Sequence, residues 1–326
     1  MKLILNPYQE PEFNLALEEY LLTSTDFELI MLWRNSKSVI IGNNQNAVEE
    51  IDVDYVRDRE IQVIRRLSGG GAVFHDLGNI NYTIIRSYKD NNFGGYEAFA
   101  YPVCEYLHSL GIKAEFSGRN DLVIDGQKFS GNAQTVKNGR IMHHGCILFD
   151  ADFSDLANAL KPKNEKIESK GVKSVRSRVT NISSHLTSSM TAGQFYDGLG
   201  EHFFTSSENV VKYTLSAEDV AAAHLLADQK YSSWDWNFGK SPAYNRESSK
   251  RYRFGTVEAK INVTAGVIDD ICLFGDFFGI LSKSELEGLL RNVPHERDAI
   301  KRVLEDIDIG AYIHGMAAED FLGLLC

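Results

Sequence analysis

A glycine-rich stretch, Arg65–Asp76, constrains this chain more than any other segment. Two arginines, Arg65 and Arg66, precede three consecutive glycines, and the apolar run Ile61–Ile64 leads into them as a strand would. Glycine lets a backbone turn sharply and lets a ligand lie against it. Successive N–H groups in such a turn bind phosphate or carboxylate, and arginine offers a fixed fork of donors to the same oxygens. The stretch is interpreted either as an anion-binding loop or as a glycine-rich hairpin with surface arginines.

Two common nucleotide-binding patterns do not fit the chain. Phe74 stands where the dinucleotide pattern G-x-G-x-x-G requires its last glycine. Gly239-Lys240-Ser241 ends like a P-loop, but Trp234 occupies the place of the first glycine of that motif. A nucleotide site in this chain must therefore be of another kind.

Length and charge limit the classes of function. A chain of 326 residues is long enough for two domains. Its formal net charge of −11 argues against general binding to nucleic acid or to membrane surfaces, because both require positive fields. A locally basic cleft is still compatible with this charge, and its candidate residues are Arg65, Arg66, Lys170, Lys173, Arg176 and Arg178.

Cysteine usage and the N-terminus bear on the cellular compartment. The four cysteines are scattered and form no CxxC pair, so neither a zinc site nor a disulfide framework is expected. A reducing, cytoplasmic compartment fits this pattern best. The first apolar run, Met1–Leu5, is too short for a signal peptide, and no segment approaches the roughly 20 apolar residues of a membrane span.

Hydrophobic spacing predicts helices and strands without a regular alternation. Helices are expected at Phe13–Leu22, Val53–Arg59 and Tyr96–Leu110, the last ended by Gly111. Strands are expected at Leu29–Trp33, Ser38–Ile41, Ile61–Ile64, Ile80–Ile85 and Arg140–Leu148, with a hairpin at Leu122–Phe129 around Asp125-Gly126. A smaller unit, Tyr252–Leu325, has expected strands at Arg253–Lys260 and Val267–Phe274 and helices near Lys283–Arg291, His295–Glu305 and Ala317–Leu325. This mixture predicts an α+β fold rather than a doubly wound α/β fold.

Three further segments carry side chains suited to chemistry. Lys128 lies between two glycines of the predicted hairpin, either as a solvated lysine or as a point charge held over a phosphate or carboxylate. Adjacent His143 and His144 on a strand point to opposite faces, so we expect one in a cleft and the other in solvent, and no shared metal. Cys146 is either a nucleophile paired with a histidine or a buried structural cysteine. The basic stretch Lys170–Asn181 is either a charged surface loop or a loop that closes over an anionic ligand.

Taken together and in order, six segments resemble the lipoate–protein ligase A family of the biotin/lipoate ligase superfamily. They are RRLSGGGAVFHDLGNINYT, GRNDL, GQKFSGNA, HHG, KSVRSRVTN and WDWNFGKSP. The resemblance covers nearly the whole chain. It implies an α+β fold with a catalytic domain of the class II biotin/lipoate-ligase type, in which helices flank a mixed sheet, at residues 1–243. A small α/β accessory domain is implied at residues 250–326.

The same resemblance implies an activity and a set of site residues. Free lipoate would attack the α-phosphate of ATP, with Mg²⁺, and the lipoyl group of the adenylate would pass to a lysine of lipoyl domains of 2-oxoacid dehydrogenase complexes or of the glycine-cleavage H protein. Lys128 is the implied catalytic residue and contacts both carboxylate and phosphate. The implied nucleotide-binding residues are Arg66, Gly71, Ala72, Val73, Phe74, His75, Asn120, Asp121 and Ser130, with Asp121 also implied for Mg²⁺. The implied lipoate-binding residues are Trp33, Ser68, Gly69, Gly70 and His144, and the implied adenylate-capping loop carries Lys173, Arg176 and Arg178.

Other functions stay open on the sequence. An ATP-independent lipoyl or octanoyl transferase would use a cysteine thioester, for which Cys146 is the candidate. A noncatalytic module would bind the lipoyl domain without turnover. A biotin ligase would share the outline of the glycine loop, but the GGGAVFHDLGN continuation, the HHG segment and the C-terminal unit favour the lipoate branch.

Overall fold

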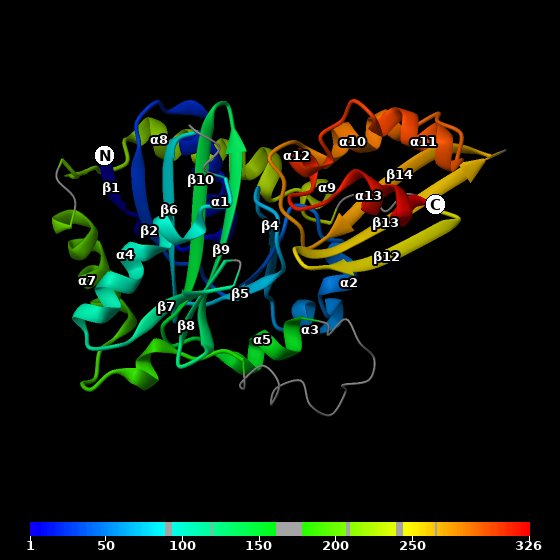
Figure 1. Cartoon of the computed structure of the whole chain (residues 1–326). Helices are drawn as coiled ribbons and strands as arrows, with labels where there is room; N and C mark the ends of the chain where they lie inside the picture. The colour runs from blue at the N-terminus through cyan, green and yellow to red at the C-terminus, as the bar shows by residue number, and fades with distance from the viewer. Residues whose placement is uncertain (89–92, 119, 161–177, 207–208, 239–243, 265) are drawn as a thin grey trace.

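The computed structural model describes residues 1–88, 93–118, 120–160, 178–206, 209–238, 244–264 and 266–326. It confirms the α+β class: a large mixed sheet with helices on both faces and a small C-terminal unit (Figure 1). The large sheet has eight strands in the order β11 (Val211–Lys212), β1 (Lys2–Leu5), β2 (Leu29–Trp33), β6 (Asn79–Ser87), β10 (Arg140–Leu148), β9 (Gln127–Lys137), β8 (Asp121–Ile124), β7 (Ala114–Ser117). Only the β11–β1 and β1–β2 pairs of this sheet are parallel.

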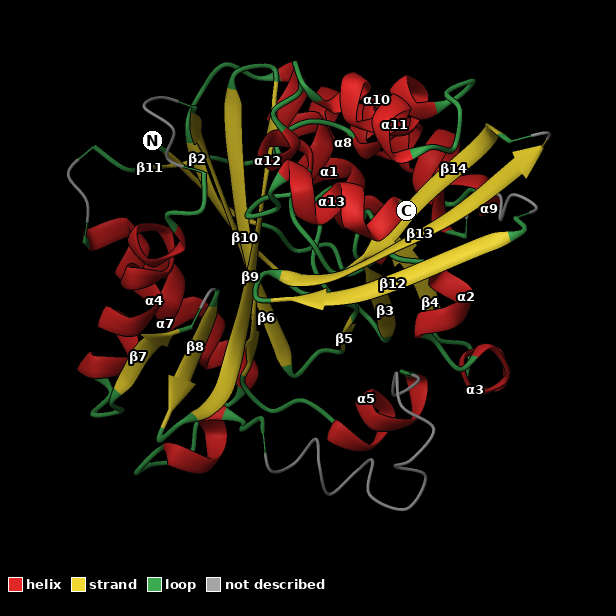
Figure 2. Ribbon diagram, turned by 45° about the vertical axis from the view of Figure 1, so that its right-hand side comes forward, coloured by secondary structure: helices red, strands yellow, loops and turns green. Residues whose placement is uncertain are grey.

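Strand alternation explains why this sheet has helices on both faces. Ile30 and Leu32 of β2 point into one apolar cluster, while Met31 and Trp33 point into another, as a period of two requires. Helices α4 (Tyr96–Ser109) and α7 (Ala192–Thr205) cover the first face, and α1 (Pro11–Ser24) and α8 (Ala217–Leu226) cover the second (Figure 2).

A second sheet of three strands carries the glycine-rich stretch. Its order is β4 (Gln62–Arg65), β3 (Ser38–Ile41), β5 (Val73–His75), so residues 66–72 connect its two outer strands. Short helices α2 (Ala47–Glu50), α3 (Val53–Asp58) and α5 (Phe153–Ala159) lie beside this sheet. The remaining short helical segments are Ile182–His185, Ala227–Tyr231 and α9 (Trp234–Asn237).

The structure confirms the predicted turn at Asp125-Gly126 and the predicted helix end at Gly111. The hairpin β8–β9 turns at Asp125 and Gly126, which have φ values of 50° and 77°, as an Asp-Gly turn requires. Helix α4 ends before Gly111, whose φ is 81°. Of the basic stretch 170–181, residues 170–177 lie outside the described residues, and the segment Ile182–His185 that follows it forms a short 3₁₀-helix.

The C-terminal unit is a three-stranded antiparallel sheet, β12 (Arg246–Tyr252), β13 (Gly255–Thr264) and β14 (Val267–Gly275), under four helices. These are α10 (Lys283–Leu290), α11 (Arg297–Leu304), α12 (Ile309–Tyr312) and α13 (Ala318–Leu325). The sequence did not reveal β12, because this polar, mostly exposed edge strand lacks an apolar alternation. The boundaries 1–243 and 250–326 stay a prediction.

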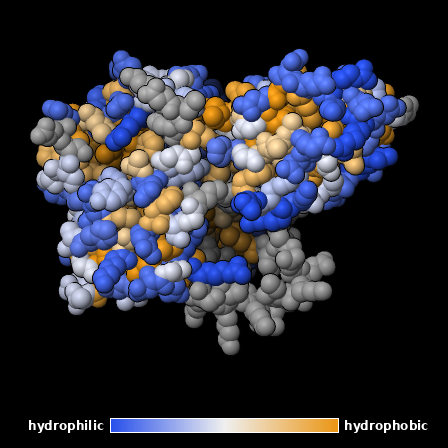
Figure 3. Space-filling model, viewed as in Figure 1, coloured by the Kyte–Doolittle hydropathy of each residue, from blue (hydrophilic) through white to orange (hydrophobic). Residues whose placement is uncertain are grey.

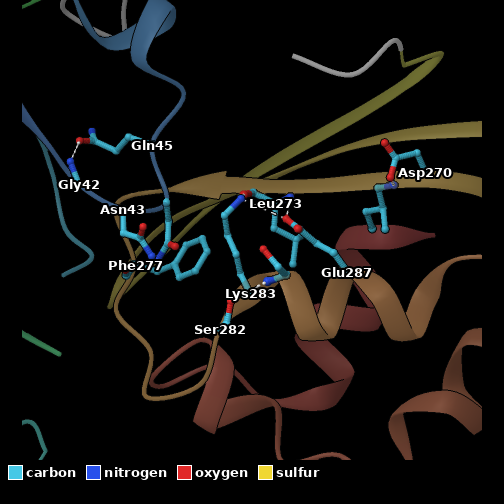
Figure 4. Close-up of polar contacts among 12 residues, drawn as sticks. Gly42, Asn43, Gln45, Asp270, Leu273, Phe277, Ser282, Lys283 and Glu287 are labelled. Atoms are coloured by element: carbon cyan, nitrogen blue, oxygen red, sulfur yellow. Dashed lines mark hydrogen bonds and ion pairs between the residues drawn. The ribbon is translucent and has the colours of Figure 1, made fainter. Parts of the chain in front are cut away.

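Hydrogen bonds and an ion pair join β14 to α10 inside this unit. Lys283 Nζ donates to the Leu273 carbonyl at 2.6 Å and pairs with Glu287 Oε1 at 3.1 Å, and that carboxylate accepts from the Leu273 amide at 2.7 Å (Figure 4). Because the lysine is both paired and hydrogen-bonded, its burial is compensated.

The turn after β14 touches the glycine-rich stretch directly. The Phe277 carbonyl accepts from the Gly70 amide at 3.2 Å and from Asn44 Nδ2 at 3.2 Å, and the Gly275 amide donates to the Asn44 carbonyl at 2.8 Å. Figure 4 shows Phe277 beside the segment that carries Gly42, Asn43 and Gln45. A Cβ on Gly69 would lie 2.1 Å from the Phe277 oxygen, so only glycine permits this approach.

The visible surface mixes hydrophilic and hydrophobic residues, with hydrophilic ones prominent on the C-terminal unit (Figure 3). Within the described part of the chain, no helix has the length and apolar character needed to cross a bilayer.

Candidate functional site

A cavity of about 260 Å³ lies where the large sheet, the glycine-rich stretch and the C-terminal turn meet. The predicted site residues on its wall are Trp33, Arg66, Gly70, Gly71, Ala72, Val73, His75, Asn120, Asp121, Lys128 and His144. Further wall residues are Leu15, Ile40, Asn81, Gly131, Asn132, Ala133, Gly145, Cys146, Asp276 and Phe278, which sequence reasoning did not assign to the nucleotide or acyl site. Those on β6, β9 and β10 reach the wall through strand register, which the chain order does not reveal, whereas Leu15 lies on α1 and Asp276 and Phe278 follow β14.

Strand register brings distant residues into two rows on the cavity side of the large sheet. One row crosses β2, β6, β10 and β9 as Trp33, Asn81, Cys146 and Gly131. The next row on the same face crosses β6, β10 and β9 as Thr83, His144 and Ala133. Side chains two residues apart share a face of a sheet, so both rows face the same side.

The glycine-rich stretch contributes only some of its residues to the wall. Val73 and His75 line the cavity, whereas Phe74 between them points into a separate apolar cluster with Val39 and Ile41. Its ring therefore lies outside the cavity, because β5 alternates, although its backbone stays next to the wall. Gly69 is not among the lining residues and instead packs against the C-terminal turn.

Both arginines of this stretch are committed to holding backbone. Arg65 guanidinium donates to the carbonyls of Gly42, Asn43 and Gln45 at 2.9, 3.1 and 2.7 Å, and also to the carbonyls of Trp236 and Asn237. It thus acts as a structural clamp and not as an anion ligand.

Arg66 lies on the cavity wall but has little donor capacity left. It donates to Ser68 Oγ at 3.0 Å and to the carbonyls of Ile40, Gly69 and Gly71 at 3.1, 2.7 and 2.9 Å. These bonds use four of the five N–H donors of a guanidinium. Burial lowers the pKa of Arg66 to about 10, so the group stays positive at neutral pH and places a fixed charge beneath the loop.

Lys128 and Asp121 form the charged side of the cavity. Lys128 Nζ lies 2.8 Å from Asp121 Oδ1, and each side chain is 38% exposed. The Lys128 backbone is also fixed, because its amide donates to the Arg178 carbonyl and its carbonyl accepts from Thr180, both at 2.9 Å. The predicted capping residues Lys173 and Arg176 lie outside the described residues, while the Arg178 side chain is exposed and does not line the cavity.

Asn120 and Ser130 differ in their access to the cavity. Asn120 reaches the wall, and its Nδ2 donates to the Asn132 carbonyl at 2.6 Å. Ser130 is 1% exposed and does not line the cavity, so the structure does not bring it to the predicted nucleotide site.

His144 belongs to a buried hydrogen-bonded network. Its Nε2 lies 2.6 Å from Ser68 Oγ, and its Nδ1 lies 3.0 Å from Glu18 Oε1. Thr83 Oγ1 donates to the same carboxylate at 2.5 Å and accepts from Trp33 Nε1 at 2.8 Å. Ser68 therefore does not line the cavity itself but positions the histidine that does.

The expectation of one solvent-facing histidine is wrong. His143 is fully buried, stacks on Phe99 at a ring separation of 5.0 Å, and lies near Tyr82 and Tyr96. Both histidines are buried because helices cover both faces of the sheet, a feature that strand alternation alone could not predict. Burial lowers the pKa of His143 well below its usual value.

Cys146 lies on the wall, yet its thiol is poorly suited to nucleophilic attack. Burial, with Asp76 acting in the same direction, raises its pKa to about 12. At neutral pH the thiol is therefore protonated, whereas a nucleophilic cysteine needs the thiolate. A protonated thiol at this position disfavours the thioester alternative.

The described residues contain no group of three or more His, Cys, Asp or Glu side chains arranged to hold a metal ion. Asp121 is the acidic residue beside Lys128, and Asn120 precedes it in the chain. Carboxylate and amide oxygens are ligands that Mg²⁺ accepts, and this ion usually takes one or two carboxylates together with substrate phosphates and water. The donor set therefore fits a magnesium ion that arrives with a phosphate ligand.

Comparison with known proteins agrees with this architecture. The model of the Lipoyl protein ligase A/B catalytic domain matches residues 10–204, and that of the Bacterial lipoate protein ligase C-terminus matches residues 241–325. The chain is 45% identical over 320 residues to Lipoate-protein ligase LplJ of Bacillus subtilis, covering 97% of each chain.

Three solved structures extend the likeness. P. falciparum LipL1 in complex with lipoate has a TM-score of 0.76 at 25% identity, covering 99% of this chain and 96% of its own. The bi-partite lipoate protein ligase from Thermoplasma acidophilum, described with its E2 lipoyl domain, has a TM-score of 0.66 at 30% identity, and the match covers 74% of this chain and 97% of its own. Lipoate-protein ligase A bound with ATP has a TM-score of 0.63 at 28% identity, and the match covers 73% of this chain and 98% of its own. On these matches, the chain belongs to the lipoyl protein ligase A/B family.

Proposed function

We propose that the protein is an ATP-dependent lipoate–protein ligase. It activates free lipoate as lipoyl-adenylate, releases pyrophosphate, and transfers the lipoyl group to a lysine of an acceptor lipoyl domain, releasing AMP. The observation that carries the proposal is one cavity with a lysine–aspartate pair, a glycine-rich backbone and an apolar wall. The related structures in complex with lipoate and bound with ATP support both substrates.

The charged side of the cavity suits adenylation. Lipoate carboxylate and the ATP α-phosphate are both anions, so they approach only where positive charge offsets their repulsion. Lys128 supplies an ammonium there, and buried Arg66 supplies a fixed charge beneath the glycine-rich stretch. From its place beside Asp121, Lys128 would contact the carboxylate and phosphate oxygens as they arrive, and would stabilise the charge that develops in the transition state.

The backbone of the glycine-rich stretch offers room for the nucleotide. A Cβ at Gly71 would meet nothing within 4 Å, so a ligand can approach this peptide closely. Ala72 and Val73 continue the wall from there. We assign the nucleotide to this part of the cavity, where N–H groups of the loop can donate to anionic oxygens.

The apolar part of the wall suits the acyl chain and its dithiolane. Leu15, Trp33, Ile40, Ala133 and Phe278 supply it. Each buried methylene contributes about 0.8 kcal/mol, so a C8 chain gains several kcal/mol of affinity from these contacts. Exclusion of water by the same residues would protect the reactive anhydride.

We propose that Asp121 binds Mg²⁺, with Asn120 as a neighbouring oxygen donor. When bound, such an ion neutralises phosphate charge. The residues of the chain then hold the phosphates in place, and Lys128 keeps its own role toward the carboxylate. Acceptors are proposed to be lipoyl domains of 2-oxoacid dehydrogenase complexes and the glycine-cleavage H protein, in line with the lipoyl domain described with the archaeal relative.

Pyrophosphate release with ATP, Mg²⁺ and lipoate, without an acceptor, tests the proposal. We expect release that depends on lipoate and that falls by at least about a hundredfold in Lys128→Ala, because the lost charge acts in the transition state. Lys212→Ala, at an exposed ion pair far from the cavity, is the control. No release in the intact protein, or full activity in Lys128→Ala, would refute the assigned chemistry.

A further inference from the structure

Three buried asparagines lead from the N-terminal segment to a histidine on the cavity wall. Asn6, Asn14 and Asn35 are 4%, 0% and 0% exposed, and His75 is 3% exposed. Asn6 Nδ2 donates to Asn14 Oδ1 at 2.7 Å, Asn14 Nδ2 donates to Asn35 Oδ1 at 2.9 Å, and Asn35 Nδ2 lies 3.1 Å from His75 Nδ1. Asn14 belongs to α1, Asn35 follows β2, and His75 ends β5.

Backbone groups fix the orientation of two of these amides. The Tyr8 N–H donates to Asn6 Oδ1 at 3.2 Å, and Asn14 Nδ2 donates to the carbonyls of Tyr8 and Arg34 at 3.1 and 3.0 Å. A backbone N–H can only donate and a carbonyl can only accept, so neither amide can be turned around without losing these bonds. Asn35 must then accept at Oδ1, and it donates from Nδ2 to the imidazole.

This orientation determines which nitrogen of His75 carries hydrogen. Burial, with smaller effects of Arg66 and His144, lowers the pKa of His75 to about 3, so the ring is neutral at physiological pH. A neutral imidazole that accepts at Nδ1 carries its hydrogen on Nε2. That Nε2 is buried and has no hydrogen-bond partner among the described residues, although the ring lines the cavity.

A second wall residue is also without partners. Both side-chain amide atoms of Asn81 are buried and unpaired within the part of the chain that the structure describes. Asn81 is the cross-strand neighbour of Trp33, whose ring centroid lies 6.0 Å from that of His75. Buried polar groups without partners are destabilising, so this corner is arranged to receive a polar ligand atom.

We propose that Asn14 and Asn35 are positioning residues that hold His75 as an Nε2–H donor for an oxygen or nitrogen acceptor of the bound ligand. The identity of that ligand, an acyl adenylate or one of its two precursors, rests on the proposed function. The tautomer, by contrast, is a property of the protein alone. The opposite tautomer would present a lone pair at Nε2 and repel the same acceptor.

The tautomer is measured directly in the full-length protein. Proton–nitrogen correlation spectra of ¹⁵N-histidine-labelled protein show which ring nitrogen of His75 is protonated, and we expect Nε2. Asn35→Asp is nearly isosteric but cannot donate, so its carboxylate should draw the hydrogen to Nδ1. His143 and His144 are internal controls in the same spectra and should keep their tautomers. An Nδ1–H tautomer in the wild type, or no change in Asn35→Asp, overturns the inference.

Ligand additions identify the acceptor. Lipoate, ATP with Mg²⁺, and a non-reactive acyl-sulfamoyl adenosine are added separately to the labelled protein. At least one should shift the His75 Nε2 proton, and the arm that does so names the component. If all three bind, as other resonances would report, and none shifts this proton, the donor role is wrong even if the enzyme releases pyrophosphate.

Kinetics separate positioning from general stability. Asn35→Leu should lower lipoate-dependent pyrophosphate release about tenfold in the wild-type background. In a His75→Ala background the same substitution should change the rate by no more than about twofold. Equal losses in both backgrounds would show a merely structural role. Asn237→Asp, a buried asparagine outside the cavity, controls for the cost of altering a buried amide. If Asn35 variants do not fold, Asn14→Asp provides the same spectroscopic test, because it removes the donor to Asn35 Oδ1.

Discussion

Replacing Gly131 with alanine tests the position of Lys128 without removing its charge. Gly131 is the residue of β9 that pairs with both Cys146 and Asp121, directly under the lysine side chain. A Cβ built there would lie 2.8 Å from Lys128 Nζ, 3.0 Å from its Cε and 3.9 Å from Asp121 Oδ1. The ammonium must therefore leave its present place.

The size of the effect follows from these distances. Nζ must retreat by about 0.6 Å to reach an ordinary contact of 3.4 Å. Misplacement of a reacting group by about 1 Å can cost about a hundredfold in rate. We therefore expect Gly131→Ala to lower lipoate-dependent pyrophosphate release about ten- to hundredfold, which corresponds to about 1.4–2.7 kcal/mol of activation free energy.

Stability should change little in the same variant, because the clash involves the end of a flexible side chain. Gly288→Ala is a matched control, since a Cβ at that helical position meets nothing within 4 Å. Both variants are compared for pyrophosphate release and for the midpoint of thermal unfolding. Wild-type activity in folded Gly131→Ala would show that the lysine position seen here is not the one that matters for adenylation.

Three further outcomes are expected. Gly69→Ala should lower pyrophosphate release and raise protease sensitivity of the C-terminal unit, because its Cβ would lie 2.1 Å from the Phe277 oxygen. If neither quantity changes, the contact between Gly69 and Phe277 matters neither for catalysis nor for docking of the unit. Cys146→Ser should retain more than about a third of the activity, as a protonated thiol is no nucleophile, and mass spectrometry should find no acyl adduct on Cys146 in the wild type. The pKa of both His75 and His143 is lowered by burial. Below about pH 6.5, each of these histidines therefore binds more protons in the unfolded chain than in the folded protein. The free energy of unfolding should then fall as the pH drops, by up to about 1.4 kcal/mol per pH unit for each histidine. Denaturant titrations check this slope, which His75→Gln should reduce.

Local chemistry made much of the fold predictable from the sequence. Apolar alternation located the core strands, and Asp125-Gly126 located the hairpin that carries Lys128, because turn type and strand period are properties of neighbouring residues. The glycine-rich stretch and Lys128 attracted attention for the same reason. The glycines and the lysine can each be recognised within a single segment, and the two segments meet at the cavity.

Contacts between distant segments could not be predicted in this way. Arg65 resembles an anion ligand until the carbonyls of Gly42 and Asn237 are seen to occupy its donors. Phe74 belongs to the same motif as Val73, yet pairing of β5 with β3 turns its ring away from the cavity. Register and long-range hydrogen bonds decide both cases, and neither leaves a mark in local composition.

The three consecutive glycines are not interchangeable, and their differences connect the two units of the chain. Gly69 leaves space for the Phe277 carbonyl, Gly70 has a φ of 92° and lies between the Phe278 ring and Arg66, and Gly71 is open on the cavity side. The stretch thus receives the C-terminal turn on one side and forms the cavity wall on the other. The Gly70 N–H already donates to the Phe277 carbonyl, so an anion that took this N–H would have to displace that carbonyl. We therefore expect anion binding at this peptide and docking of the C-terminal turn to oppose each other.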